Sequence, residues 1–231
     1  MSSASHAWTE EEENGIHWHE LSPERRIHWT IKHGEPGSKW GWAVIRTTYN
    51  PELHKHWESF KEAIYDRTCK EVAKSDNPHI TDSLEWVFIE DPKLEGASLE
   101  ELKQRFRSWV RAECGETAID IDTNGAPLGS RYTYFIEVDE ESLLSMMDPS
   151  GLHKGHVKII RGWHDPKPIP PGEDAVDEFE NPMFEDEDVM KIRTTLLCPE
   201  FYDELENEEM WWLWYSAPQG VVRPRYDFYS D

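Results

Sequence analysis

Residues 39–49 read Lys-Trp-Gly-Trp-Ala-Val-Ile-Arg-Thr-Thr-Tyr, and Asn50 and Pro51 follow directly. β-branched and aromatic residues crowd this run, which predicts a mostly buried strand. Asparagine followed by proline is typical of the start of a helix. The next apolar residues recur at spacings of four, three and four, as Leu53, Trp57, Phe60 and Ile64. That spacing predicts the buried stripe of a helix running to about Ala73.

Strands and helices continue to alternate after this helix. Three further runs rich in β-branched and aromatic residues predict strands at 84–89, 132–138 and 156–163. Ser98 and Glu101 form a capping box, in which each side chain satisfies the backbone N–H of the other. This box opens a second helix, whose apolar stripe comprises Leu99, Leu102, Phe106, Trp109 and Val110. A third, short helix follows Asp139.

The predicted element order is strand, helix, strand, helix, strand, short helix, strand. Without the second helix this is βαββαβ, the pattern of a ferredoxin-like core. We therefore predict an α+β fold with a ferredoxin-like core and one helix inserted between its second and third strands. The alternative is a three-layer α/β sheet in which every helix is a crossover between strands.

The composition divides the chain into four parts. Residues 1–38 are predicted to be a partly disordered N-terminal extension, and residues 39–165 the α+β core. Residues 166–188 begin with four prolines in six residues, and 173–188 hold nine acids and no Lys or Arg. Such a segment repels itself and favours a solvated loop. Residues 189–231 regain apolar content, include a tryptophan-rich run and are predicted to pack on the core.

The charge balance bears on the kind of partner. The chain has 24 Lys and Arg against 47 Asp and Glu, a net charge of −23 with neutral histidines. A basic footprint for phosphate is missing, so the sequence argues against nucleic-acid binding. The negative electrostatic field of such a chain favours a cationic ligand, a metal or a basic protein partner. The 12% aromatic residues carry enough burial energy to argue against general disorder.

The cysteines and the apolar runs bear on compartment. Cys69, Cys114 and Cys198 are odd in number and widely separated, which favours unbridged thiols in a reducing compartment. The N-terminus lacks the apolar region of a signal peptide. Apolar runs stay well short of the ~18 residues of a membrane span. We therefore expect a cytoplasmic protein that does not insert into membranes.

Residues 40–49 and the amphipathic helix after them resemble a set of uncharacterised filamentous-fungal proteins. Strand 132–138 and the tryptophan-rich tail add to this likeness, which spans roughly residues 39–215. The resemblance implies a soluble fungal protein. It assigns no catalytic residue and leaves the cofactor unknown.

The N-terminal histidines are a candidate metal site. Ile16-His17-Trp18 and Ile27-His28-Trp29 repeat one triplet. If residues 22–25 form a hairpin turn, His17, His19 and His28 share one face of the two strands. Three imidazoles with an open fourth position suit a catalytic zinc. The alternative is a helix from Pro23 to His33 that stops at Gly34, which removes this register.

Three other groups of residues are candidates. His164 beside Asp165 is a candidate proton carrier, because a carboxylate tunes a histidine base. Trp211, Trp212 and Trp214 dock on the core or, where exposed, mark a partner or ligand surface. Glu185 and Asp186 belong to the acidic segment, which suits a basic partner.

These features support three hypotheses for function. The first is a non-catalytic protein-interaction or regulatory protein with a basic protein partner. The second is a cofactor-free small-molecule enzyme, a cyclase or isomerase of fungal secondary metabolism, whose open sheet face or tryptophan-rich tail walls a pocket for a small apolar ligand. The third is a histidine-ligated metal protein.

Overall fold

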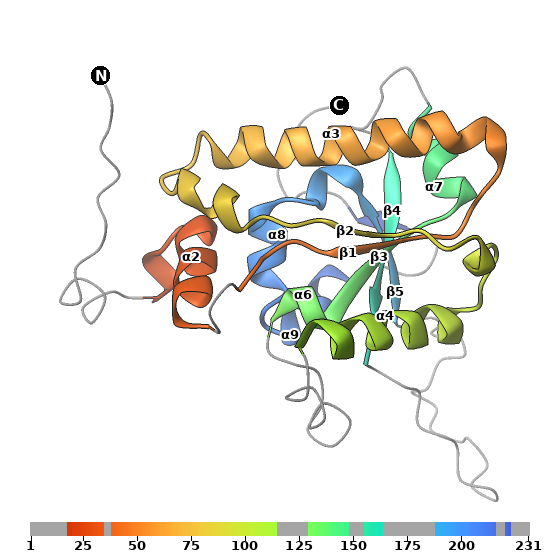
Figure 1. Ribbon diagram of the computed structural model, residues 1–231. Helices are drawn as coiled ribbons and strands as arrows, with labels where there is room; N and C mark the ends of the chain where they lie inside the picture. Colours follow the sequence, from red (N-terminus) through yellow and green to blue (C-terminus); the bar gives the residue numbers. More distant parts are fainter. Residues whose placement is uncertain are drawn as a thin grey trace, which may run out of the picture.

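The computed structural model describes residues 18–34, 38–114, 129–147, 155–163, 188–215 and 220–222. These residues form a central sheet with helices on both faces (Figure 1). The strands are β1 (Ala43–Arg46), β2 (Val87–Ile89), β3 (Tyr134–Val138), β4 (His156–Arg161), β5 (Val189–Arg193) and β6 (Val221–Val222). The helices are α2 (Pro23–His33), α3 (His54–Val72), α4 (Leu99–Cys114), α6 (Ser130–Thr133), α7 (Glu140–Ser145), α8 (Pro199–Glu204) and α9 (Glu209–Trp214).

The sheet is mixed, with strand order β2-β1-β3-β4-β5-β6. β1 lies between β2 and β3 and is parallel to both. β4 is antiparallel to β3 and to β5, and β6 is parallel to β5. From β1 the chain passes to β2 on one side, and from β3 it passes to β4 on the other. The chain thus leaves β1 and β3 in opposite directions along the sheet, although α3 and α7 pack on the same face.

Local sequence explains where the first long helices begin. The Asn50 side chain accepts a hydrogen bond from the Glu52 amide, and Pro51 starts a short 3₁₀ turn that leads into α3. The predicted stripe of α3 is confirmed, because Leu53, Trp57, Phe60 and Ile64 are all buried. The predicted capping box of α4 is also confirmed, with Glu101 accepting from the Ser98 amide at 2.8 Å.

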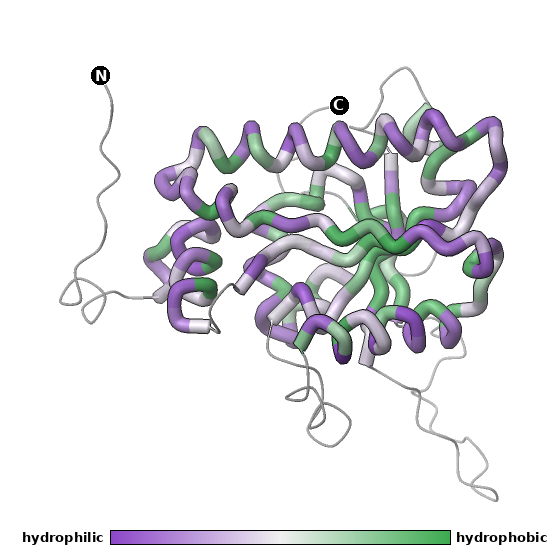
Figure 2. The backbone as a smooth tube through the Cα atoms, in the orientation of Figure 1, coloured by the Kyte–Doolittle hydropathy of each residue, from purple (hydrophilic) through white to green (hydrophobic). Residues whose placement is uncertain are grey.

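Each face of the sheet has its own apolar cluster. On one face, α3 and α7–α9 pack on residues that include Val44, Ile136, Ile159 and Ile192. On the other, Leu102, Phe106 and Val110 of α4 pack on Ala43, Ile45, Phe135 and Ile160. The hydropathy follows this division, with apolar strands between helices whose outer faces are hydrophilic (Figure 2). All four residues of β1 are buried, as expected for a parallel strand covered on both faces.

The mixed α+β class is confirmed, but the strand arrangement differs from the predicted ferredoxin-like core. In a ferredoxin-like sheet another strand separates the two strands of each βαβ unit, whereas β1 and β2 are direct parallel neighbours here. The physical reason is α4. This helix is not an insertion but a crossover on the face opposite α3, and it returns the chain to the far side of β1. The alternative, a three-layer sheet in which every helix is a crossover, is correct for α3 and α4. It is wrong for α7, because the strands that α7 joins, β3 and β4, are antiparallel.

Residues 189–215 and 220–222 belong to the same sheet and core. β5 and β6 extend the sheet, and Phe201, Tyr202, Trp211 and Trp214 join the cluster that contains α3. α2 packs on α8, where Arg26 bonds Asp203 through two nitrogens at 2.8 and 2.6 Å. Within the described ranges, no helix has both the length and the apolar character to cross a bilayer.

The adjacent tryptophans of α9 provide a test of this packing. Trp211 is fully buried and stacks on Tyr134 with ring centroids 5.5 Å apart, whereas Trp212 is 50% exposed. We expect Trp211→Ala to lower the free energy of unfolding by about 3–5 kcal/mol, and Trp212→Ala by less than about 1 kcal/mol. Urea denaturation followed by circular dichroism measures both. Equal losses would contradict the orientation of α9.

Candidate functional site

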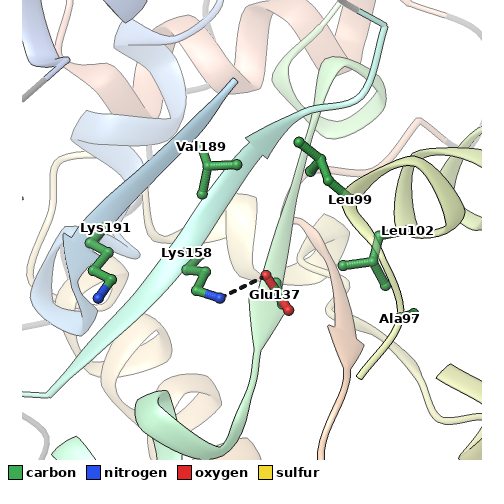
Figure 3. Close-up of a pocket in the computed structure, with 7 residues that line it drawn as sticks. All are labelled: Ala97, Leu99, Leu102, Glu137, Lys158, Val189 and Lys191. Atoms are coloured by element: carbon green, nitrogen blue, oxygen red, sulfur yellow. Dashed lines mark ion pairs between the residues drawn. The ribbon is translucent and has the colours of Figure 1, made fainter. Parts of the chain in front are cut away.

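A cavity of about 280 Å³ lies over the sheet beside the carboxyl end of β3. Its floor is formed by Glu137 of β3, Lys158 of β4 and Lys191 of β5. Its wall is apolar and comes from the start of α4 and the start of β5, as Ala97, Leu99, Leu102 and Val189. Figure 3 shows the charged side chains on neighbouring strands, with the leucines of α4 to one side. The site is therefore amphipathic.

The register of the sheet places the three charged residues in one row. Glu137 pairs with Lys158 across β3 and β4, and Lys158 pairs with Lys191 across β4 and β5. Since side chains alternate along a strand, all three share the α4 face with Phe135 and Ile160. α4 packs on those two apolar residues, and the charged row lies beyond its first turn.

Glu137 is 8% exposed and holds two hydrogen-bonding partners. The Thr47 hydroxyl, just past β1, donates to Glu137 Oε1 at 3.0 Å, and Lys158 Nζ lies 3.3 Å from Oε2. Burial raises the pKa of the Glu137 carboxyl, and the opposing effects of the Lys158 charge and the Thr47 bond do not cancel this rise. Glu137 is thus a buried carboxyl that gains a proton more readily than an ordinary glutamate.

Lys158 is held from a second side by Asp139. Its Nζ lies 2.7 Å from Asp139 Oδ2, and Asp139 also caps α7 by accepting from the Ser142 amide at 2.8 Å. Burial alone would raise the pKa of Asp139, but the bonds from Lys158 and Ser142 lower it overall. Burial by itself would lower the pKa of Lys158, but the charges of Glu137 and Asp139 and their bonds to this lysine raise its pKa overall. Lys158 is therefore a fixed cation.

Lys191 is held by a more exposed partner. Its Nζ lies 2.7 and 2.9 Å from the two carboxylate oxygens of Glu141 on α7, whose side chain is 57% exposed. His156 Nε2 lies 3.4 Å from the same carboxylate. Burial lowers the pKa of His156, which Glu141 only partly offsets. An exposed carboxylate is readily replaced, so Lys191 is the cation more accessible to a ligand.

The predicted metal site is not formed as a hairpin. His17 lies outside the described residues, while His19 is exposed in a short 3₁₀ turn and His28 lies in α2. The alternative helix is confirmed from Pro23 to His33, because the Ser22 side chain caps it and proline at its first position favours helix over strand. In the described part of the chain, no group of three or more His, Cys, Asp or Glu is placed to hold a metal ion.

The other predicted site residues have different outcomes. His164, Asp165, Glu185 and Asp186 lie outside the described residues. Of the tryptophans expected to dock on the core or, where exposed, to mark a partner surface, Trp211 and Trp214 are buried in the core, which is the docked alternative. Their ring systems pack on Tyr134 and Phe201. Trp212 and Leu213 are 50% and 71% exposed.

The sequence did carry a signal for the residues that line the cavity. Glu137, Lys158 and Lys191 each stand between two apolar residues inside a short strand, as in Tyr-Phe-Ile-Glu-Val. A charge inside a buried strand needs partners, and such groups cluster at functional sites. The order of the strands was needed to show that these three charges are neighbours.

Comparison with protein-family models, curated proteins and solved structures found no match to this chain.

The pair of Asp139 and Lys158 gives a pH-dependent prediction. Because the folded pKa of Asp139 is lowered, its contribution to stability is present above its unfolded value of about 3.9 and is lost as the pH falls through the folded value. We expect Asp139→Asn to destabilise the protein by about 1–2 kcal/mol at pH 7. The difference in the free energy of unfolding between the native protein and Asp139→Asn, measured by urea titration, should shrink towards pH 3. Glu62→Gln, an exposed charge removed from α3, is the matched control. A loss independent of pH would contradict the ion pair.

Proposed function

We propose that this protein binds a small organic anion with a short apolar part in the cavity over β3, β4 and β5. The observation that carries the proposal is the direct opposition of Lys158 and Lys191 on the cavity floor. Both lysines are paired with carboxylates in the free protein, and an anion that displaces Glu141 from Lys191 lies between two cations held directly opposite each other. The side chains are 22% and 25% exposed, so a ligand reaches both from solvent.

The size and charge of the site limit the ligand. A cavity of about 280 Å³ is at the lower end of the volumes found for ligand pockets. The overall charge of −23 repels multiply charged anions, while screening beyond about 8 Å leaves the two lysines and their paired carboxylates as the charges that a small ligand meets. These features favour a monoanion.

The apolar wall determines the other end of the ligand. Leu99, Leu102, Ala97 and Val189 line the side towards α4. Each buried methylene of a ligand against such a wall contributes about 0.8 kcal/mol. A short alkyl or aromatic group next to the anionic group therefore fits the cavity better than a fully polar ion.

Binding of 1-butanesulfonate, measured by isothermal titration calorimetry, tests this function. We expect saturable binding, and no comparable binding of the uncharged 1-butanol. Lys191→Met should weaken binding about tenfold or more, because one of two cations is lost. Glu141→Gln should strengthen binding several-fold, because the ligand no longer competes with that carboxylate for Lys191.

Lys55→Met is the matched control, since it removes an exposed positive charge from α3 on the opposite face of the sheet. It should leave the affinity close to that of the native protein. Equal weakening by Lys55→Met and Lys191→Met would show that net charge, and not the cavity, governs binding. Absence of any saturable binding would contradict the proposed function.

A second candidate function is protein interaction, which a separate observation favours. Trp212 and Leu213 are adjacent on α9 and strongly exposed, and the guanidinium of Arg161 lies 5.4 Å from the Trp212 ring centroid. Exposed tryptophan with a neighbouring arginine is a composition typical of interface centres.

Photo-crosslinking in cells of the source organism tests this interaction. A photoreactive phenylalanine at position 212 should give a discrete crosslinked partner. The same group at Tyr65 of α3, which is 47% exposed, is the control and should not give that product. Identical products from both positions, or none from position 212, would contradict an interface on α9.

A further inference from the structure

The carboxyl of Glu137 lies on the same cavity floor as the two lysines that would hold the anion. Its Oε2 is 3.3 Å from Lys158 Nζ. An anion bound by Lys158 therefore approaches the Glu137 carboxylate, which is itself only 8% exposed. Two negative charges so close repel each other strongly, because the low local dielectric screens them weakly.

We propose that the site takes up one proton on Glu137 with each anion that it binds. This inference rests on the anion-binding function proposed above. The proton comes from solvent and adds to a carboxylate oxygen, so the ion pair between Glu137 and Lys158 is replaced by a pair between the ligand and Lys158. The total charge of the cavity is the same before and after binding.

The surroundings of Glu137 can accommodate the neutral form. Thr47 donates to the ionised carboxylate, and its hydroxyl can turn to accept a hydrogen bond from a protonated one. Asp139, just beyond β3, keeps Lys158 paired at 2.7 Å, so that lysine is not left without a carboxylate partner. From α4 and the loop before it, the residues that line the cavity are the apolar Ala97, Leu99 and Leu102. Protonation of Glu137 thus leaves each neighbouring charge with a partner.

The direction of the pH dependence follows from this coupling. Burial already raises the pKa of Glu137 in the free protein, and a bound anion raises it further. Between the two values, the free protein lacks the proton and the complex carries it. Affinity should therefore fall as pH rises through this range, by up to about tenfold per pH unit.

His156 is the alternative proton acceptor and must be distinguished. It lies on the same face of β4 as Lys158 and 3.4 Å from Glu141, the carboxylate that a ligand would displace from Lys191. Burial lowers the pKa of His156 in the free protein, so an anion nearby could also make this ring take up a proton. Proton uptake by the native protein is therefore required but does not by itself identify Glu137. The experiment must also show which of the two residues takes up the proton.

The experiment is calorimetry with 1-butanesulfonate between pH 5 and 7 in two cationic buffers, Bis-Tris and imidazole, which differ in their heat of ionisation. The sulfonate is fully ionised throughout, so any proton taken up belongs to the protein. We expect uptake approaching one proton per bound sulfonate in the native protein and in His156→Asn. Glu137→Gln should bind at least as tightly, with uptake abolished and the pH dependence lost.

The outcomes separate the two proposals. Saturable binding without proton uptake overturns the role of Glu137 and leaves the proposed function standing. Uptake that persists in Glu137→Gln and vanishes in His156→Asn assigns the proton to His156 and also overturns the inference. Absence of binding in the native protein overturns both. Carbon-13 NMR of the Glu137 carboxyl in the native protein gives the same decision without a substitution, since its titration should move to higher pH when the sulfonate is added.

Discussion

The burial of β1 on both faces is the constraint on which the rest of the structure depends. All four of its residues are enclosed, with Val44 in the cluster that contains α3 and Ile45 in the cluster that contains α4. A strand covered in this way needs a helix on each face, and α3 and α4 supply them as successive crossovers. These crossovers place β2 and β3 on opposite sides of β1, and this order directs the chain from β3 towards β4 and β5.

The charged cavity follows from the limited reach of α4. This helix covers Ile45, Phe135 and Ile160, and further along the same face the strands carry Glu137, Lys158 and Lys191 instead of apolar residues. Glu137, Asp139 and Glu141 pair with the two lysines, so the charges are held in place without a ligand. Because Asp139 is less exposed than Glu141, Lys158 in the middle of the row is firmly paired, whereas the carboxylate partner of Lys191 at the end of the row is readily exchanged. An anion-binding site and a proton-accepting carboxyl are two consequences of this one arrangement.

Local sequence patterns predicted the individual helices and strands better than they predicted how these elements assemble. The stripe of Trp57, Phe60 and Ile64, the capping box of Ser98 and Glu101, and the cap at Asp139 depend on contacts within one turn of helix, and the sequence predicted all of them. The face on which α4 lies is a long-range property, so a ferredoxin-like core was the wrong choice of strand order. The N-terminal histidine hairpin was wrong because Ser22 and Pro23 form a good helix start. This local signal outweighed the alternation of histidines with apolar residues that suggested two strands. The cavity itself combines single charges from three strands, which only the sheet register brings together.

The central claim is that the row of Glu137, Lys158 and Lys191 on the open part of the α4 face is where this protein binds its ligand. Mapping of amide chemical-shift changes by NMR during titration with 1-butanesulfonate tests it most directly. The account predicts that the largest changes cluster at residues 137, 158 and 191 and at the start of α4. Largest changes at α9, or around Arg107 and Arg111 on the other half of α4, would contradict it.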